Sequence, residues 1–389
     1  MVNEKDQPNK RLKVCYFGTY RANYERNRWM IDRLTRQNVI VIECHVPLWR
    51  GLEDREQVAS GGWLKPAFWM RFVLAYGRLI WRYFHIGDYD VMVIGYPGQP
   101  DVPLGWLLSR LRKKPLVWDI FMSIYLIATE RQIDSRSPIS SNLIQSIERF
   151  SLKLPDLLIV DTPAYSEWYQ NQYQIDPEKI KLIPTGADDR EFRPREVTTS
   201  HTVFRCLYYG SYIPNHGVKY IVEAAVLLSN QPDIQFVFVG TGPEKQQVED
   251  LVHQSGLTSV TFHDWMAKQE LLREIDHADV ILGSFGVTPQ ALMTMQHKIH
   301  EGLAMAKPII NGDSPLMRQI LEHKKHIYLC EREDPKSLAD AILTLYQNAE
   351  LRGQLSRNGF AFYQENYAFD KLGANYALIL QQLAQSRAG

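Results

Sequence analysis

The 389-residue sequence lacks several features that would define its class. It has four cysteines (Cys15, Cys44, Cys206 and Cys330) without paired spacing, each in or beside an apolar run. This pattern predicts free, buried thiols in a reducing compartment and excludes a disulfide framework. No apolar run reaches the ~18 residues of a membrane-spanning helix, and the polar start Met-Val-Asn-Glu-Lys-Asp is not typical of a signal peptide. The sequence therefore predicts a cytoplasmic protein.

The sequence also has no net charge, because 44 basic residues balance 44 acidic ones. The distribution is uneven: residues 1–195 hold 28 Lys+Arg and 23 Asp+Glu, whereas residues 196–389 hold 16 and 21. A basic first half is compatible with anionic lipid, a phosphorylated acceptor or nucleic acid, and equally with an ordinary solvated surface. The length and the 45% hydrophobic content predict two globular α/β domains.

Residues 278–312 read as a strand, a loop, one helix and a second strand. The apolar run 279–282 is stopped by Gly283 and Gly286, and a second apolar pair stands before Asn311-Gly312, which is typical of buried parallel strands. Ligands of open α/β sheets lie beyond the carboxyl ends of the strands, and a helix start offers N–H groups to an anion. The loop 283–286 and the following helix therefore predict a ligand crevice.

Glu301 is the candidate ligand-binding residue of that helix. A carboxylate one turn into the helix can accept hydrogen bonds from two neighbouring sugar hydroxyls, which predicts a ribose or hexose clamp. The alternative interpretation is a surface ion pair between Lys298 and Glu301. His297, His300 and Glu301 match no zinc-helix signature, so no metal site is expected.

The stretch LGSFG…KIHEGLAMAKPII resembles the donor-binding segment of retaining GT-B glycosyltransferases of glycosyltransferase family four, the glycosyl transferases group one. The resemblance spans residues 12–365. It implies an α/β fold of two Rossmann-like parallel-sheet domains facing each other across a cleft, with a C-terminal helix crossing back to the first domain. The expected parts are an acceptor-binding domain (1–190), a linker (191–203), a nucleotide-sugar-binding domain (204–365) and the terminal helix (366–389).

The sequence departs from this family at the donor site. Many members carry a second glutamate where Met293 stands, so contact with the transferred sugar is expected from main chain around Phe285 and Gly286. The loop from Gly210 to Gly217 resembles the segment that grips the donor diphosphate with an arginine and a lysine; here those positions are Ser211 and His216. Backbone N–H groups of that loop, Lys298, and His216 if protonated remain as candidates to hold the phosphates. A helix-start residue on the surface is the alternative for His216.

Three further positions are site candidates. Trp265 lies in a loop similar to the one that contacts the nucleobase, where it would stack or pack. Gly18, after the first predicted strand, would allow the donor close to the backbone. Asp119 ends a strand at the place that in the family lies near the acceptor, although the family's histidine is missing. We expect it to orient or deprotonate the acceptor hydroxyl, with a helix cap as the alternative.

Arginines suggest the acceptor or membrane side. Arg26, at the start of the first predicted helix, would meet a phosphate or belong to a solvated face. Residues 63–84 mix aromatic and aliphatic side chains with Arg71, Arg78 and Arg82. Such an amphipathic helix suits a membrane interface or a lipid-linked acceptor, and packing on the sheet is the alternative.

The resemblance implies a glycosyltransferase, specifically a hexosyltransferase, that moves a sugar from a nucleoside diphosphate sugar to an acceptor hydroxyl with retention. Glycan, glycolipid or polysaccharide biosynthesis is the expected context. The expected partner is the nucleotide sugar, with no cofactor and no nucleic acid. A lipid-linked acceptor and peripheral contact with the inner membrane face are further hypotheses. A nucleotide-sugar epimerase and a catalytically inactive GT-B-like binding subunit are the rival functions.

Overall fold

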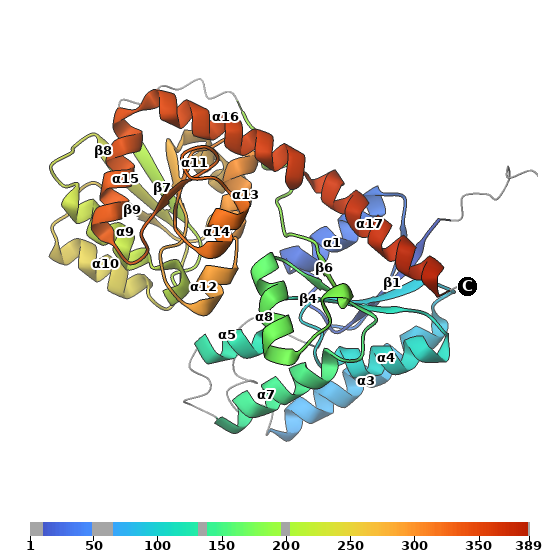
Figure 1. Cartoon of the computed structure of the whole chain (residues 1–389). Helices are drawn as coiled ribbons and strands as arrows, with labels where there is room; N and C mark the ends of the chain where they lie inside the picture. The colour runs from blue at the N-terminus through green and yellow to red at the C-terminus, as the bar shows by residue number, and fades with distance from the viewer. Residues whose placement is uncertain (1–10, 49–64, 131–137, 196–202, 388–389) are drawn as a thin grey trace, which may run out of the picture. The chain divides into compact units, whose positions relative to one another are not determined.

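The computed structural model describes residues 11–48, 65–130, 138–195 and 203–387. The chain divides into two compact units (Figure 1). The first comprises residues 1–184 together with 370–389, and the second comprises residues 185–369. Each unit has its own parallel sheet and its own hydrophobic core.

The first unit is built on six parallel strands in the order β2-β1-β3-β4-β5-β6. Strands β3, β4 and β5 are buried along their whole length, as expected where helices cover both faces of a parallel sheet. The strands are β1 (Lys13–Gly18), β2 (Ile40–His45), β3 (Val91–Ile94), β4 (Leu116–Phe121), β5 (Leu157–Val160) and β6 (Ile180–Leu182).

Helices α1 (Glu25–Arg36) and α17 (Phe369–Ser386) cover one face of this sheet, where Met30 and Leu34 join Tyr376 and Leu380 in one core. The C-terminal helix thus returns to the first unit, although α16 (Ala349–Asn366), which precedes it, belongs to the second (Figure 1). This confirms the crossing-back helix. The other helices are α3 (Pro66–His85), α4 (Asp101–Leu111), α5 (Ile124–Glu130), α7 (Pro138–Ser151) and α8 (Pro163–Tyr173).

The second unit is also a six-stranded parallel sheet, in the order β12-β11-β10-β7-β8-β9. The strand order reverses between β7 and β10, which is the topological switch point where doubly wound sheets bind ligands. The strands are β7 (Phe204–Tyr209), β8 (Ile234–Val239), β9 (Val260–His263), β10 (Val280–Leu282), β11 (Ile309–Gly312) and β12 (Tyr328–Cys330).

Two helices, not the one predicted, lie between β10 and β11. Thr288 caps the short helix α12 (Pro289–Met293) by accepting a hydrogen bond from the backbone N–H of Ala291, and Pro289 occupies its first position. The chain is then extended at Thr294 and Gln296, so α13 (His297–Ala304) begins anew. The remaining helices are α9 (Val218–Leu227), α10 (Lys245–Gln254), α11 (Lys268–His277), α14 (Pro315–Ile320) and α15 (Pro335–Gln347), with short 3-10 turns η2 (Pro177–Lys179) and η3 (Pro214–His216).

The cysteines and the longest helices bear on two further properties of the chain. All four cysteines are buried and free, as their placement in apolar runs predicts. Across the described ranges, none of the helices is both long and apolar enough to cross a bilayer.

Candidate functional site in the second unit

The loops after β7 and β10 meet at the switch point of the second sheet. The backbone N–H of Phe285 donates to the carbonyl of His216 over 2.9 Å. Gly217 and Gly286 allow this approach: a Cβ on Gly217 would lie 2.6 Å from the Gly286 nitrogen, and one on Gly286 would lie 2.2 Å from the Pro214 carbonyl oxygen. Both distances are shorter than any real Cβ contact, so the loop pair requires glycine at both positions.

Three candidate donor-binding residues gather at the end of β7. A Cβ on Gly210 would lie 3.3 Å from Lys298 Nζ and 3.4 Å from His216 Cε1. Gly210 adopts a φ of 142°, which favours glycine. The structure thus brings together Gly210, His216 and Lys298, from two elements that are about 80 residues apart in the sequence.

The Lys298 side chain is buried, with an exposed fraction of only 4%. Its ammonium group donates to the Gly283 carbonyl oxygen over 3.3 Å and lies 3.9 Å from the centre of the Tyr208 ring. Burial lowers the pKa of Lys298 well below its usual range, and the nearby Glu301 carboxylate opposes this by favouring the charged form. An anion bound beside this buried amine would stabilise its charged form, in place of the water that burial has removed.

His216 is held as a neutral imidazole. Its Nδ1 lies 2.7 Å from the Ser211 carbonyl oxygen and 2.8 Å from the Tyr208 hydroxyl. A carbonyl oxygen only accepts, so the proton lies on Nδ1 and Nε2 is left as an acceptor. Burial and the charge of Lys298 hold the pKa of His216 well below its usual range. The protonated form suggested for phosphate binding is therefore disfavoured at neutral pH, and Ser211 contributes its carbonyl group to this arrangement.

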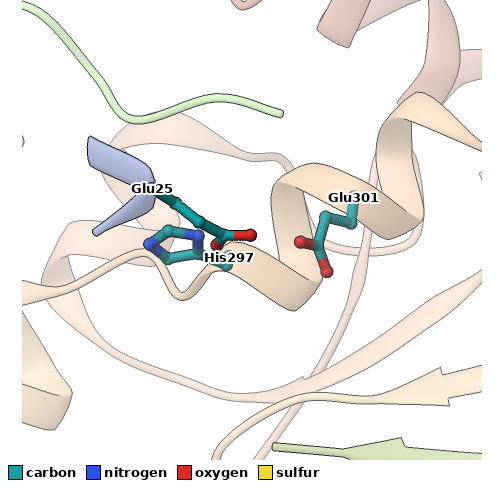
Figure 2. Close-up of side chains that lie close together, drawn as sticks. All are labelled: Glu25, His297 and Glu301. Carbon is teal, nitrogen blue, oxygen red and sulfur yellow. The ribbon is translucent and has the colours of Figure 1, made fainter. Parts of the chain in front are cut away.

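The Glu301 side chain is buried, with an exposed fraction of 6%. With Lys298 buried as well, the alternative of a surface ion pair is wrong. Glu301 follows His297 by one turn of α13 (Figure 2). The Tyr209 phenol hydrogen-bonds to it, and burial followed by the Glu301 charge raises the pKa of that phenol. Its role as a sugar clamp stays a prediction.

Arg332 is a residue of this region that sequence reasoning missed. It follows β12, and its guanidinium donates to the carbonyls of Gly286 and Asp313, each over 2.6 Å. Burial lowers its pKa to about 10. The side chain thereby ties the loops after β10, β11 and β12 together. The sequence signal that could have identified Arg332 is its position: it is a charged residue shortly after a buried apolar strand, at the edge where ligands bind.

Trp265 lines a pocket that these loops do not border. It is 56% exposed and lines an open pocket of about 500 Å³ after β9, together with Asp264, Met266 and residues of α11. None of the residues lining this pocket belongs to the described loops after β7 or β10. Contact of Trp265 with a nucleobase stays a prediction.

Two candidates of the first unit, Arg26 and Asp119, bind each other. The Arg26 guanidinium forms two hydrogen bonds to the Asp119 carboxylate, of 3.1 and 2.9 Å, and a third of 2.7 Å to the Ile183 carbonyl. Asp161 lies 3.7 Å away, and Arg26 and Asp119 are both fully buried. Arg26 is thus occupied internally and not presented to a phosphate. Asp119 does not cap the next helix, because Ser123 and Glu148 accept from the first N–H groups of α5.

The space beside Gly18 is filled by a side chain of the protein. A Cβ on Gly18 would lie 2.6 Å from a carboxylate oxygen of Asp101. That carboxylate accepts from the Thr19 backbone N–H over 2.8 Å and from the Tyr76 hydroxyl over 2.6 Å. The close approach to the Gly18 backbone is thus made by Asp101, and approach of the donor at Gly18 stays a prediction.

The three remaining arginine candidates, Arg71, Arg78 and Arg82, all lie on α3. Arg78 is exposed, Arg71 lies 5.8 Å from the Phe68 ring centre, and Arg82 donates to the His45 carbonyl. All three arginines therefore lie on a single helix, as the sequence predicted.

Comparison with known proteins finds similarity to glycosyltransferases. Residues 203–348 match the family model of the glycosyl transferases group 1. Among curated proteins, alpha-D-kanosaminyltransferase of Streptomyces kanamyceticus is 23% identical over 290 residues, covering 72% of this chain and 73% of that protein. D-inositol 3-phosphate glycosyltransferase of Paenarthrobacter aurescens is 23% identical over 230 residues, covering 56% of this chain and 55% of that protein.

Solved structures share the fold of the whole chain. Sucrose-phosphate synthase of Thermosynechococcus elongatus superposes with a TM-score of 0.73 at 16% identity, over 97% of this chain and 100% of that one. HepE of Anabaena, in complex with UDP, superposes with a TM-score of 0.70 at 15% identity, over 96% and 100%. Residues 203–348 are thus similar in sequence to the glycosyl transferases group 1, and the chain has the two-domain GT-B fold.

Proposed function

We propose that this protein transfers a sugar from a nucleoside diphosphate sugar to an acceptor hydroxyl, with the second unit holding the donor. The observation that carries the proposal is the buried amine of Lys298 at the switch point, next to Gly210 and on the same helix, α13, as the Glu301 carboxylate. A bound diphosphate would favour the charged form of this amine, and the ammonium would in turn stabilise the diphosphate as it departs. HepE, a structural neighbour, was solved with UDP and with UDP-glucose, which supports a nucleotide sugar as the donor.

The donor would contact this chain through four groups. Lys298 and the backbone N–H groups of the 210–217 loop would hold the diphosphate, and Glu301 would accept from sugar or ribose hydroxyls. Main chain at Phe285 and Gly286 would contact the transferred sugar, since the thioether of Met293 accepts hydrogen bonds only weakly. Retention of configuration and a hexose as the transferred sugar are parts of this proposal.

Binding of nucleotides tests it first. Calorimetry with UDP, GDP and their sugars should show binding of one base class, and Glu301→Gln should weaken binding of the nucleotide sugar. Glu223→Gln, on the half-exposed side of α9, is the matched control and should leave the affinity unchanged. Unchanged affinity in Glu301→Gln would contradict the assignment of Glu301.

Turnover separates the proposed transferase from its rivals. Release of nucleoside diphosphate that depends on an added acceptor supports transfer. Formation of an epimeric nucleotide sugar without acceptor would favour the epimerase. Tight donor binding with neither product would favour an inactive binding subunit, the rival motivated by Ser211, His216 and Met293.

The acceptor is a further part of this proposal. A lipid-linked acceptor in glycan, glycolipid or polysaccharide biosynthesis would place the protein at the cytoplasmic face of the inner membrane. To assist deprotonation of the acceptor hydroxyl, the Asp119 carboxylate would have to be released from its hydrogen bonds with Arg26. These statements stay predictions.

A further inference from the structure

Exposed apolar side chains are concentrated on three helices of the first unit. Of the 21 large hydrophobic side chains that are exposed among the described residues, 14 lie on α3, α4 and α7. A soluble surface normally carries such side chains singly. Their concentration on neighbouring elements therefore needs a partner.

Helix α3 shows the arrangement most clearly. Ala75, Leu79 and Tyr83 face the sheet and are buried. On the opposite side, Met70, Val73, Trp81 and Phe84 are each more than 60% exposed. The outward face of this 20-residue helix is therefore apolar, and no element among the described residues covers it.

Helices α3 and α4 are neighbours on the same side of the first sheet (Figure 1). The Tyr83 hydroxyl of α3 donates to the Leu108 carbonyl of α4 over 2.8 Å. Both helices contact the same face, because the Tyr83 ring meets Phe17 at 6.1 Å and Gly105 of α4 lies directly on Ile94. The outward side chains of α4, including Leu107 and Leu111, thus extend the apolar surface of α3.

The charges on these helices have one sign. Helix α3 contains no carboxylate, whereas Arg71, Arg78 and Arg82 follow one edge of its outward face at spacings of 7 and 4 residues. At 3.6 residues per turn these spacings bring the three arginines to one side. The carboxylates of α4 and α7, Asp101 and Glu148, are 1% and 0% exposed, so they do not offset the exposed positive charge.

From this combination we infer that α3 and α4 form a docking surface for an anionic lipid bilayer, with α3 lying in the plane of the interface. Trp81, Phe84 and Met70 enter the acyl boundary, and the arginine edge contacts lipid phosphates. The surface lies on α3 and α4 and not at the switch point of the second unit, so the inference stands independently of the proposed function.

A second copy of the chain fits this surface less well. A two-fold dimer through α3 would place the same three arginines of both copies in one interface, and no exposed carboxylate on α3 would compensate them. A bilayer containing anionic lipid supplies both the apolar phase and the negative charge.

Vesicle sedimentation tests the inference. The full chain is mixed with phosphatidylcholine vesicles with and without phosphatidylglycerol. The wild type should sediment with the anionic vesicles, and added salt should weaken this binding. Trp81→Ser with Phe84→Ser should lower the binding about tenfold or more, and Arg71→Gln, Arg78→Gln and Arg82→Gln together should remove the preference for anionic lipid.

The matched control is Leu378→Ser. Leu378 on α17 is 52% exposed, comparable with the α3 side chains, but it lies on the helix that covers the other face of the sheet. It should leave binding unchanged, and thermal melting should confirm that every variant is folded. Failure of the wild type to bind either vesicle would overturn the inference. So would a dimer, found by light scattering, that Trp81→Ser dissociates.

Discussion

Among single residues, Lys298 has the environment that a bound anion would change most. Its replacement by methionine should lower the affinity for nucleoside diphosphate about 10- to 100-fold, because a charge-assisted hydrogen bond contributes about 1.5–3 kcal/mol. Isothermal calorimetry with the nucleotide measures this. The exposed Lys336 on α15 gives the control variant Lys336→Met, which should bind as the wild type does.

Proton linkage provides an independent readout for Lys298. Burial lowers the pKa of its ammonium in the free protein, and a bound diphosphate raises it again by favouring the charged form. Binding should therefore take up a proton in the pH range between these two pKa values, and the affinity should fall as the pH rises through that range. Calorimetry in buffers of different ionisation enthalpy should show the uptake in the wild type and its absence in Lys298→Met.

Asp101 makes a second residue-level prediction, this time for stability. Burial raises the pKa of Asp101 to about 6, above its value of about 3.9 in an unfolded chain. The folded protein then holds the extra proton between these values, so this group's contribution to the free energy of unfolding should fall as the pH rises from about 4 to about 6. A shift of this size corresponds to about 2–3 kcal/mol.

The variant Asp101→Asn should remove that part of the pH dependence, as measured by urea unfolding at several pH values. Asp250→Asn, at an exposed position of α10, is the control and should keep the slope of the wild type. The inference about Asp101 fails if the wild type and Asp101→Asn lose stability in parallel over this range.

At the scale of elements, the contact between the loops after β7 and β10 depends on Gly286. A methyl group there would meet the Pro214 carbonyl at 2.2 Å, so Gly286→Ala should separate the loops at a cost of about 1–3 kcal/mol. We expect weaker nucleotide binding together with lower stability. Gly87→Ala is the control, since a Cβ at Gly87 meets nothing within 4 Å. Nucleotide titration and thermal melting of both variants measure the two effects.

The ion pair between Arg26 and Asp119 connects α1 to β4 and to the chain at Ile183. Arg26→Met should destabilise the first unit by about 3–5 kcal/mol, because it leaves a buried carboxylate without its partner. The double variant with Asp119→Asn should lose less stability than the sum of the two single losses, as measured by urea unfolding.

If Asp119 also assists the acceptor hydroxyl, Asp119→Asn abolishes sugar transfer while the donor affinity stays intact. Unchanged transfer would limit Asp119 to the structural role.

Local pattern was sufficient to predict most elements but not their contacts. Several strands end at or directly before a glycine, as β7 does before Gly210. Thr162 caps α8, with Pro163 at its first position. The break between α12 and α13 was missed because residues 289–304 keep an apolar period across it. The pairing of Arg26 with Asp119, 93 positions apart, and of Gly18 with Asp101, depends on the assembled sheet, which no local spacing encodes.

For the whole molecule, the division into units predicts which fragments retain function. Residues 185–369 contain the Lys298 site and the complete second sheet. This fragment should bind nucleoside diphosphate within about a factor of ten of the whole chain, ~1.4 kcal/mol. Residues 1–184 alone should be unstable, since they lack Tyr376 and Leu380 of α17, which are fully buried in the core of the first unit. Circular dichroism and calorimetry on the two fragments check both outcomes.

The carboxylate of Asp101 bears on how many nucleotides one chain binds. Both are doubly wound, and each has a reversal of strand order where a nucleotide would be accommodated. In the first, between β1 and β3, the protein has placed its own anion against Gly18 and Thr19. A negatively charged ligand is repelled there, so saturation should occur at a stoichiometry of one nucleotide per polypeptide, despite the repeated scaffold.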